Sequence, residues 1–159
     1  GCGYVTFYKY FTSKIDLVRQ VMKEVYDEIH RESFASLPEG LPDEDAIRSG
    51  ITRTVKAIQK HREVLLALER AVGLGSELLE LRNRLLHRDV EELERLITEL
   101  ESQGLEPGLD PFAASLALNS MVEEMSRRWL LYEDRLPEKT FVETLVRIFQ
   151  AILMGRESR

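Results

Sequence analysis

The first fourteen residues bring together side chains that can bind phosphate. Phenol, hydroxyl and ammonium groups, which form hydrogen bonds and ion pairs with phosphate oxygens, belong to Thr6, Tyr8, Lys9, Tyr10 and Lys14. Lys14 lies in the first turn of a predicted helix, where free backbone N–H groups and the helix dipole also favour an anion. No acidic residue occurs in this segment. Its composition predicts a clamp on a DNA backbone.

The same segment also fits a purely structural interpretation. Phe7 and Phe11 stand four positions apart, so they share one face of a helix and can pack against the helix that follows. The aromatic residues would then close the end of a helical bundle, and the lysines would simply be solvated. Residue types and spacing favour neither interpretation over the other.

The elements that must position this segment are helices. Apolar residues recur every three or four positions through most of the chain, which is typical of amphipathic helices and not of strands. The predicted helices span residues 15–33, 44–60, 64–72, 77–102, 111–132 and 138–154. Start signals are Ser13 with Asp16, then Asp43, then Asp110 before Pro111. We expect an all-α bundle of five or six helices after a short N-terminal piece.

The last predicted helix is apolar on two sides. One stripe consists of Phe141, Leu145, Ile148 and Ile152, and the other of Val142, Val146, Phe149 and Leu153. One stripe can pack on its own domain, whereas the second needs a partner, most simply a second copy of the chain. The predicted dimer interface combines the first stripe with Leu118 and Val122 of the preceding helix. The pattern does not decide which face of the last helix meets the partner.

Composition narrows the function classes. The 159 residues are 43% hydrophobic and 31% charged, as in one globular domain. The net charge of −6 argues against a general nucleic-acid binder, so DNA contact would be confined to the basic N-terminal segment. No apolar run is long enough for a bilayer and no export signal is recognisable, so we expect a cytoplasmic protein without a membrane partner. The single cysteine, Cys2, excludes an intramolecular disulfide.

Patterns typical of catalysis or metal binding are missing from the sequence. His30, His61 and His87 fall on three different predicted helices, and neither paired Glu-x-x-His spacings nor a Gly-rich phosphate loop occurs. We therefore expect no enzyme activity, no metal and no cofactor. An enzyme with a helical pocket stays an alternative, and it would depend on His87, which stands one turn from Glu91.

The N-terminal stretch "GCGYVTFYKYFTSKIDLV" resembles the end of the helix-turn-helix of the TetR (tetracycline-repressor-like) family of transcription regulators. That family's pattern is roughly Gly-Val-Ser-x-Gly-Thr-hydrophobic-Tyr-x-Tyr-Phe-x-Ser-Lys-x-x-Leu. The matching residues are Gly1, Thr6, Phe7, Tyr8, Tyr10, Phe11, Ser13, Lys14 and Leu17. Cys2, Gly3 and Val5 depart from it, and Tyr4 stands at a variable position. The match covers about 18 residues, and the rest of the chain agrees only in the number, order and length of its helices.

The resemblance implies that two segments of the chain have different functions. Residues 1–14 would be the last part of a DNA-binding domain that has two further helices before Gly1, and residues 15–159 a ligand-binding and dimerisation domain. Residues 4–10 would be the recognition helix, with Tyr4, Val5 and Thr6 nearer to base edges. Tyr8, Tyr10 and Lys14 would contact phosphates, and the sequence of the operator stays open.

The resemblance further implies the function and the partners. The protein would be a ligand-responsive repressor, a homodimer built from the last two helices, which releases double-stranded operator DNA when an apolar or amphipathic small molecule binds. The candidate pocket residues are Phe34, His87, Asn119, Met121, Met125 and Trp129. Apart from Asn119, a polar residue inside an apolar helix, residues of these types are more often simple core. The alternative is a helical homodimeric interaction module that does not bind DNA.

Overall fold

The computed structural model describes residues 11–35, 43–73, 75–103, 108–132 and 136–153. Six helices occupy these ranges: α2 (Lys14–Phe34), α3 (Glu44–Lys60), α4 (Arg62–Val72), α5 (Ser76–Ser102), α6 (Pro111–Tyr132) and α7 (Glu138–Leu153). No strand occurs in the described ranges. The predicted all-α class is confirmed, and the helix ends lie close to their predicted positions.

The three predicted helix starts are confirmed by their caps. The Ser13 hydroxyl accepts the Asp16 N–H at 3.0 Å, and the Asp16 carboxylate accepts the N–H of Thr12 at 3.0 Å. Asp43 and Asp110 each accept the backbone N–H three positions ahead, at 2.7 and 2.8 Å. These bonds satisfy N–H groups that have no partner inside a helix, which explains why the helices begin where they do.

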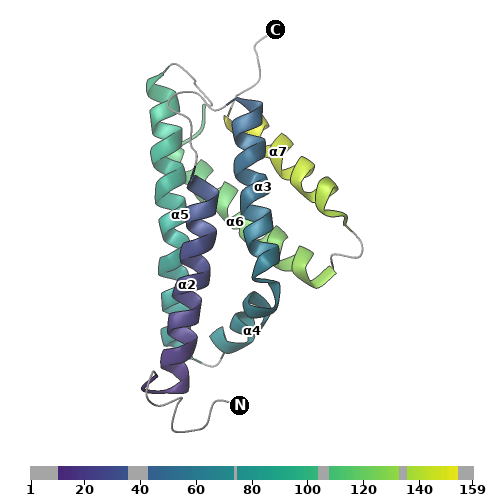
Figure 1. The fold of residues 1–159 in the computed structure, drawn as a ribbon. Coiled ribbons are helices and arrows are strands. Elements are labelled where there is room, and N and C mark those ends of the chain that lie inside the picture. Colours follow the sequence, from purple (N-terminus) through teal and green to yellow (C-terminus); the bar gives the residue numbers. More distant parts are fainter. Residues whose placement is uncertain (1–10, 36–42, 74, 104–107, 133–135, 154–159) are drawn as a thin grey trace.

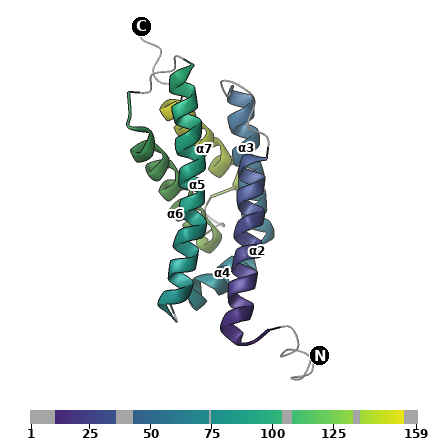
Figure 2. The same ribbon diagram turned by 90° about the vertical axis from the view of Figure 1, so that its left-hand side faces the viewer.

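The bundle is elongated, with α5 along most of its length (Figure 1). α5 packs chiefly against α6 and also against α2, while α3 packs against both α2 and α7. The short α4 lies at the end of the bundle where α2 begins, and α7 lies towards the other end, as the turned view in Figure 2 also shows. α4 and α7 therefore lie towards opposite ends of the bundle.

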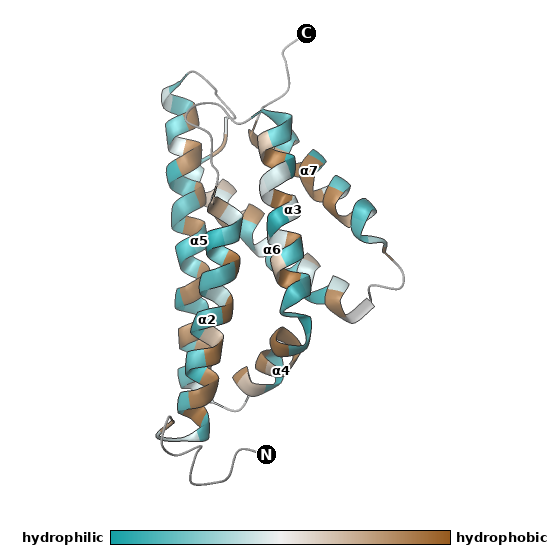
Figure 3. Cartoon of the chain, viewed as in Figure 1, coloured by the Kyte–Doolittle hydropathy of each residue, from teal (hydrophilic) through white to brown (hydrophobic). Residues whose placement is uncertain are grey.

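The main core lies among α3, α5, α6 and α7. Hydrophobic residues gather on the faces that these helices turn towards one another (Figure 3). Trp129 stacks on Phe141 with ring centroids 4.7 Å apart, and its indole N–H donates to the Leu136 carbonyl at 2.8 Å. The indole is therefore both packed and hydrogen-bonded, as a buried tryptophan requires.

Both apolar stripes of α7 pack inside the chain. Phe141 and Leu145 of the first stripe are buried, and so are Val142 and Val146 of the second. Leu118 on α6 is buried as well. These side chains are covered by the rest of the chain, chiefly by α3, whereas Ile148, Phe149 and Ile152 further along α7 are only partly buried. That one face of this helix meets a partner stays a prediction.

A second, smaller cluster joins α2, α4 and α5 at the α4 end of the bundle. Its buried members are Met22, Leu68, Leu78 and Leu81. Leu78 is 4% exposed, whereas its neighbour Leu79 on the same helix is 43% exposed. This cluster fixes the α4 end of α2 against the rest of the molecule.

Leu78→Ala should lower the free energy of unfolding by about 2–5 kcal/mol, because it leaves a cavity in this cluster. Leu79→Ala should change it by no more than about 0.5 kcal/mol, since that side chain is exposed. Urea unfolding followed by circular dichroism measures both. Equal effects of the two variants would mean that the smaller cluster does not hold α2 and α4 to α5.

Candidate functional site

A cavity of about 190 Å³ lies between the helices, with residues of all six contributing to its wall. The wall is mostly aliphatic and aromatic. Towards α7 it is formed by side chains such as Ile47, Leu145, Phe149 and Leu153. An apolar wall with a few polar groups is the usual form of a small-molecule site, although this space is smaller than most such sites.

One wall of the cavity belongs to α2. Tyr26, Ile29, Ser33 and Phe34, which follow one another at helical spacing, line it. The Ser33 hydroxyl donates to the Ile29 carbonyl at 2.8 Å and lies 2.9 Å from the Thr54 hydroxyl of α3. These hydroxyls satisfy one another, so α2 offers the cavity mainly apolar surface and one phenol.

The polar side chains gather towards α4. Arg82 of α5 forms ion pairs with Glu69 of α4, at 3.2 Å, and with Glu123 of α6. Arg82 is only 16% exposed, so this guanidinium ties three helices together in a partly desolvated place. It is one positive charge facing two negative charges, and all three side chains line the cavity.

Burial shifts the pKa values of side chains at the α4 end of the cavity. Burial raises the pKa of the Glu123 carboxyl; Arg82 opposes the rise, and the nearby Glu69 carboxylate adds to it. Burial likewise raises the pKa of the Tyr26 phenol, which therefore stays neutral at physiological pH. Both raised pKa values mean that burial disfavours a negative charge at the α4 end of the cavity.

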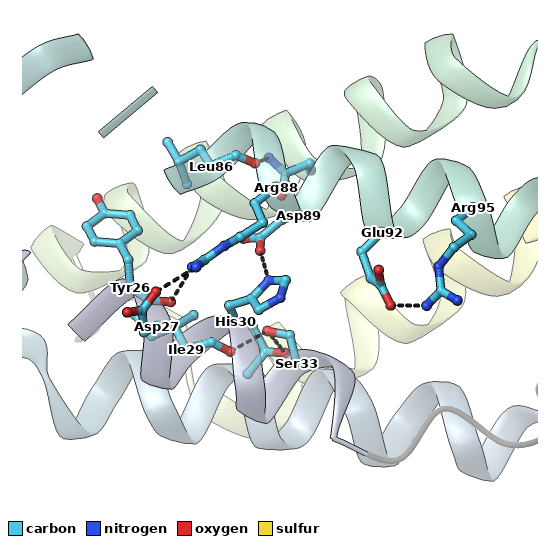
Figure 4. Close-up of polar contacts among 12 residues, drawn as sticks. Tyr26, Asp27, Ile29, His30, Ser33, Leu86, Arg88, Asp89, Glu92 and Arg95 are labelled. Carbon is cyan, nitrogen blue, oxygen red and sulfur yellow. Dashed lines mark hydrogen bonds and ion pairs between the residues drawn. The ribbon is translucent and has the colours of Figure 1, made fainter. Parts of the chain in front are cut away.

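A histidine–carboxylate pair crosses from α2 to α5 beside the cavity. His30 Nδ1 contacts the Asp89 carboxylate, and one turn away Asp27 pairs with Arg88 at 2.6 Å (Figure 4). Asp89 also lines the cavity. Burial raises the pKa of its carboxyl, and His30 opposes that rise. α2 is therefore held to α5 by two polar pairs at the level of the cavity.

Ser126 presents an unused hydroxyl to the cavity. The residue is 5% exposed and lines the space one helical turn from Glu123. Among the described residues its Oγ has no hydrogen-bond partner. A buried hydroxyl without a partner is costly, and such groups occur where a ligand or water completes the bond. Arg82 Nε at the same wall is likewise buried without a partner among the described residues, so the cavity offers an occupant both a hydroxyl and an N–H donor.

The predicted pocket residues divide into two groups. Phe34 and Asn119 line the cavity. His87 is exposed beside Glu91, and Trp129 is stacked in the core. Met121 and Met125 are partly buried against the same core but do not line the cavity.

The polar residues of the cavity were missed because glutamates and arginines along a helix usually mark its solvated side. Glu123 and Ser126 share one face of the helix with Val122 and Leu130. This spacing is the feature of the sequence that indicates an inward-facing position for the two polar residues.

The other predicted site residues are placed as follows. Of the DNA-binding set, Lys14 is the exposed first residue of α2, whereas Tyr4, Val5, Thr6, Tyr8, Lys9 and Tyr10 lie outside the described residues. Of the predicted interface, Val122, Ile148 and Ile152 are partly buried, and the other three are buried. Large apolar side chains that are exposed instead include Leu109, Phe112 and Leu116, at the start of α6.

Comparisons with known proteins add no assignment. No protein-family model matches the chain, and no curated protein matches it either. Within the described ranges, no three histidine, cysteine or acidic side chains are placed to hold a metal ion. In those same ranges, no helix has the length and apolar character needed to cross a bilayer. Inferences about function therefore start from the cavity and from the helix that connects it to the N-terminal motif.

Ser126→Ala should leave the free energy of unfolding unchanged or raise it by up to about 1 kcal/mol, because it removes an unpaired buried hydroxyl. The matched control is Ser115→Ala on the same helix. The Ser115 hydroxyl is fully buried and donates to the Phe112 carbonyl at 2.8 Å, so its loss should cost about 0.5–1.5 kcal/mol. Thermal and urea unfolding measure both. A clear loss of stability in Ser126→Ala would show that its hydroxyl is already paired.

Proposed function

We propose that this chain contains the regulatory body of a DNA-binding transcription regulator similar to the TetR family. In this proposal it acts as a repressor that releases double-stranded operator DNA when a small molecule occupies the cavity. The observation that carries the proposal is that one continuous helix, α2, begins at the Lys14 of the matched motif and lines the cavity near its other end. A rod of 21 residues spans about 30 Å, which connects the two places without a hinge.

The contacts of α2 support a coupling between cavity and motif. Glu28 binds both Lys60 and His61 of the α3–α4 junction, at 2.5 and 2.9 Å, and Arg19 pairs with Glu77 of α5. A ligand that pushes on the cavity wall would shift α2 as one body against these contacts. It can do so only by binding one arrangement more tightly, and such couplings are typically about 1–3 kcal/mol.

The proposal includes a homodimer, because two recognition helices must reach half-sites about one DNA turn apart, roughly 34–36 Å. Phe112 and Leu116 stand one turn apart on α6 and are exposed, and Leu109, just before this helix, is exposed as well. A second copy would cover this apolar surface through the same residues. We place the dimer contact at the start of α6, beside α7.

Lys14→Ala should weaken binding to the gene's own promoter fragment. It should also lower the slope of log affinity against log salt by about 1, because one phosphate contact is lost. Lys23→Ala, an exposed lysine further along α2, is the control and should leave the slope unchanged. Fluorescence anisotropy of the gene's full-length product at several salt concentrations measures both. Equal slopes for wild type and both variants would favour the interaction module that does not bind DNA.

Leu116→Glu should convert the dimer to a monomer, since it would bury an unpaired charge at the contact. Leu79→Glu changes a leucine of nearly equal exposure, 43% against 44%, on α5 and should leave the dimer intact. Sedimentation velocity gives the masses. A wild-type chain that is monomeric at high concentration would contradict the dimer.

A further inference from the structure

One arginine is shared by two carboxylates at the cavity wall. Arg82 forms ion pairs with both Glu69 and Glu123, so this group of three carries one negative charge at the α4 end of the cavity. Arg127, which also lines the cavity, makes a two-bond contact to Glu124, with both distances 2.9 Å, and Arg128 shares that carboxylate. That second group carries one positive charge but is more exposed than the Arg82 group.

The third carboxylate at the cavity wall has a partner of its own, because Asp89 contacts His30 Nδ1. A ligand carboxylate would add a further negative charge near Glu69 and Glu123, where burial already disfavours one. A ligand cation would instead bring the charge of the Arg82, Glu69 and Glu123 group to zero, and partly desolvated ion pairs are attractive only when each charge has a partner.

Ser126 offers a further hydrogen-bond partner to the same head group. Its buried Oγ is unpartnered and lies one turn from Glu123 on the same face of α6. A hydroxyl oxygen accepts a hydrogen bond, and an ammonium group offers three donors. Such a group can therefore bind a carboxylate and the Ser126 hydroxyl together.

The size of the cavity limits the body of the ligand. An apolar cavity of about 150 Å³ holds one benzene ring. The cavity here has about 190 Å³ and is apolar towards α7. It therefore suits one ring with a short chain, rather than the larger molecules that occupy sites of about 300–1,000 Å³.

We propose that the cavity binds a small amphipathic amine, with its ring in the apolar part and its protonated amine between Glu123, Glu69 and the Ser126 hydroxyl. The inference rests on the proposed function in one respect, because it names the chemical class of the molecule that would act as the effector. Binding to the cavity can nevertheless be measured without DNA.

Three probes with the same phenylethyl body separate charge from size: phenethylamine, phenethyl alcohol and hydrocinnamate. Isothermal titration calorimetry of the 159-residue chain at pH 7 should give a dissociation constant for the amine about tenfold below that of the alcohol. The carboxylate should bind most weakly. Equal affinities, tighter binding of the carboxylate, or no binding of any probe at millimolar concentration would overturn the proposal.

Substitutions inside and outside the cavity test where the amine binds. Glu123→Gln should abolish the preference for the amine over the alcohol, and Glu69→Gln provides a second test if the first variant does not fold. Ser126→Ala should weaken the amine about two- to tenfold, the loss expected for one hydrogen bond. Glu80→Gln changes an exposed glutamate of α5 outside the cavity and should have no effect. An effect of Glu80→Gln equal to that of Glu123→Gln would place the amine on the surface and overturn the proposal.

The two proposals fail in different experiments. If the amine binds as described but the full-length product shows no salt-dependent promoter binding, the amine site stands and the regulator function falls. If promoter binding is found while the amine preference is absent, only the inference about the ligand is wrong.

Discussion

The packing of α2 against α3 and α5 is the constraint on which the rest of the structure depends. Met22 and Val25 of α2 are buried, and polar pairs from Asp27, Glu28 and His30 fix the helix on two sides. Apolar burial supplies most of the favourable free energy, whereas the partly buried pairs set the position of the helix along its neighbours. Because the same helix forms one wall of the cavity, its position determines the size of that space.

The cavity combines two features that folding alone does not favour. A void loses packing contacts, and a buried group without a partner loses solvation. Both occur together where Ser126 meets the open space, and the unequal charges of Arg82, Glu69 and Glu123 lie beside it. Local departures from good packing and full pairing are expected at functional sites, where a ligand supplies what is missing.

The predicted site and the observed cavity overlap only in part. Phe34 and Asn119 line the cavity as predicted, and the signal for Asn119 was an amide inside an apolar helix. Trp129 was placed in the pocket, but its stacking on Phe141 makes it core. Arg82 was not recognised, because a single sequence does not tell a solvated arginine from one that faces carboxylates on two other helices.

The sequence by itself determined the all-α class and the helix ends, since caps such as Ser13 and Asp43 and the helical spacing of apolar residues act within a few positions. Only the tertiary structure decided which apolar face is covered. Phe141 is buried by its own chain, whereas Ile148 and Ile152 of the same stripe are partly exposed. The tertiary structure also brought Glu69, Arg82 and Glu123 together from three helices. Such contacts depend on how helices cross, and helix periodicity leaves the crossing open.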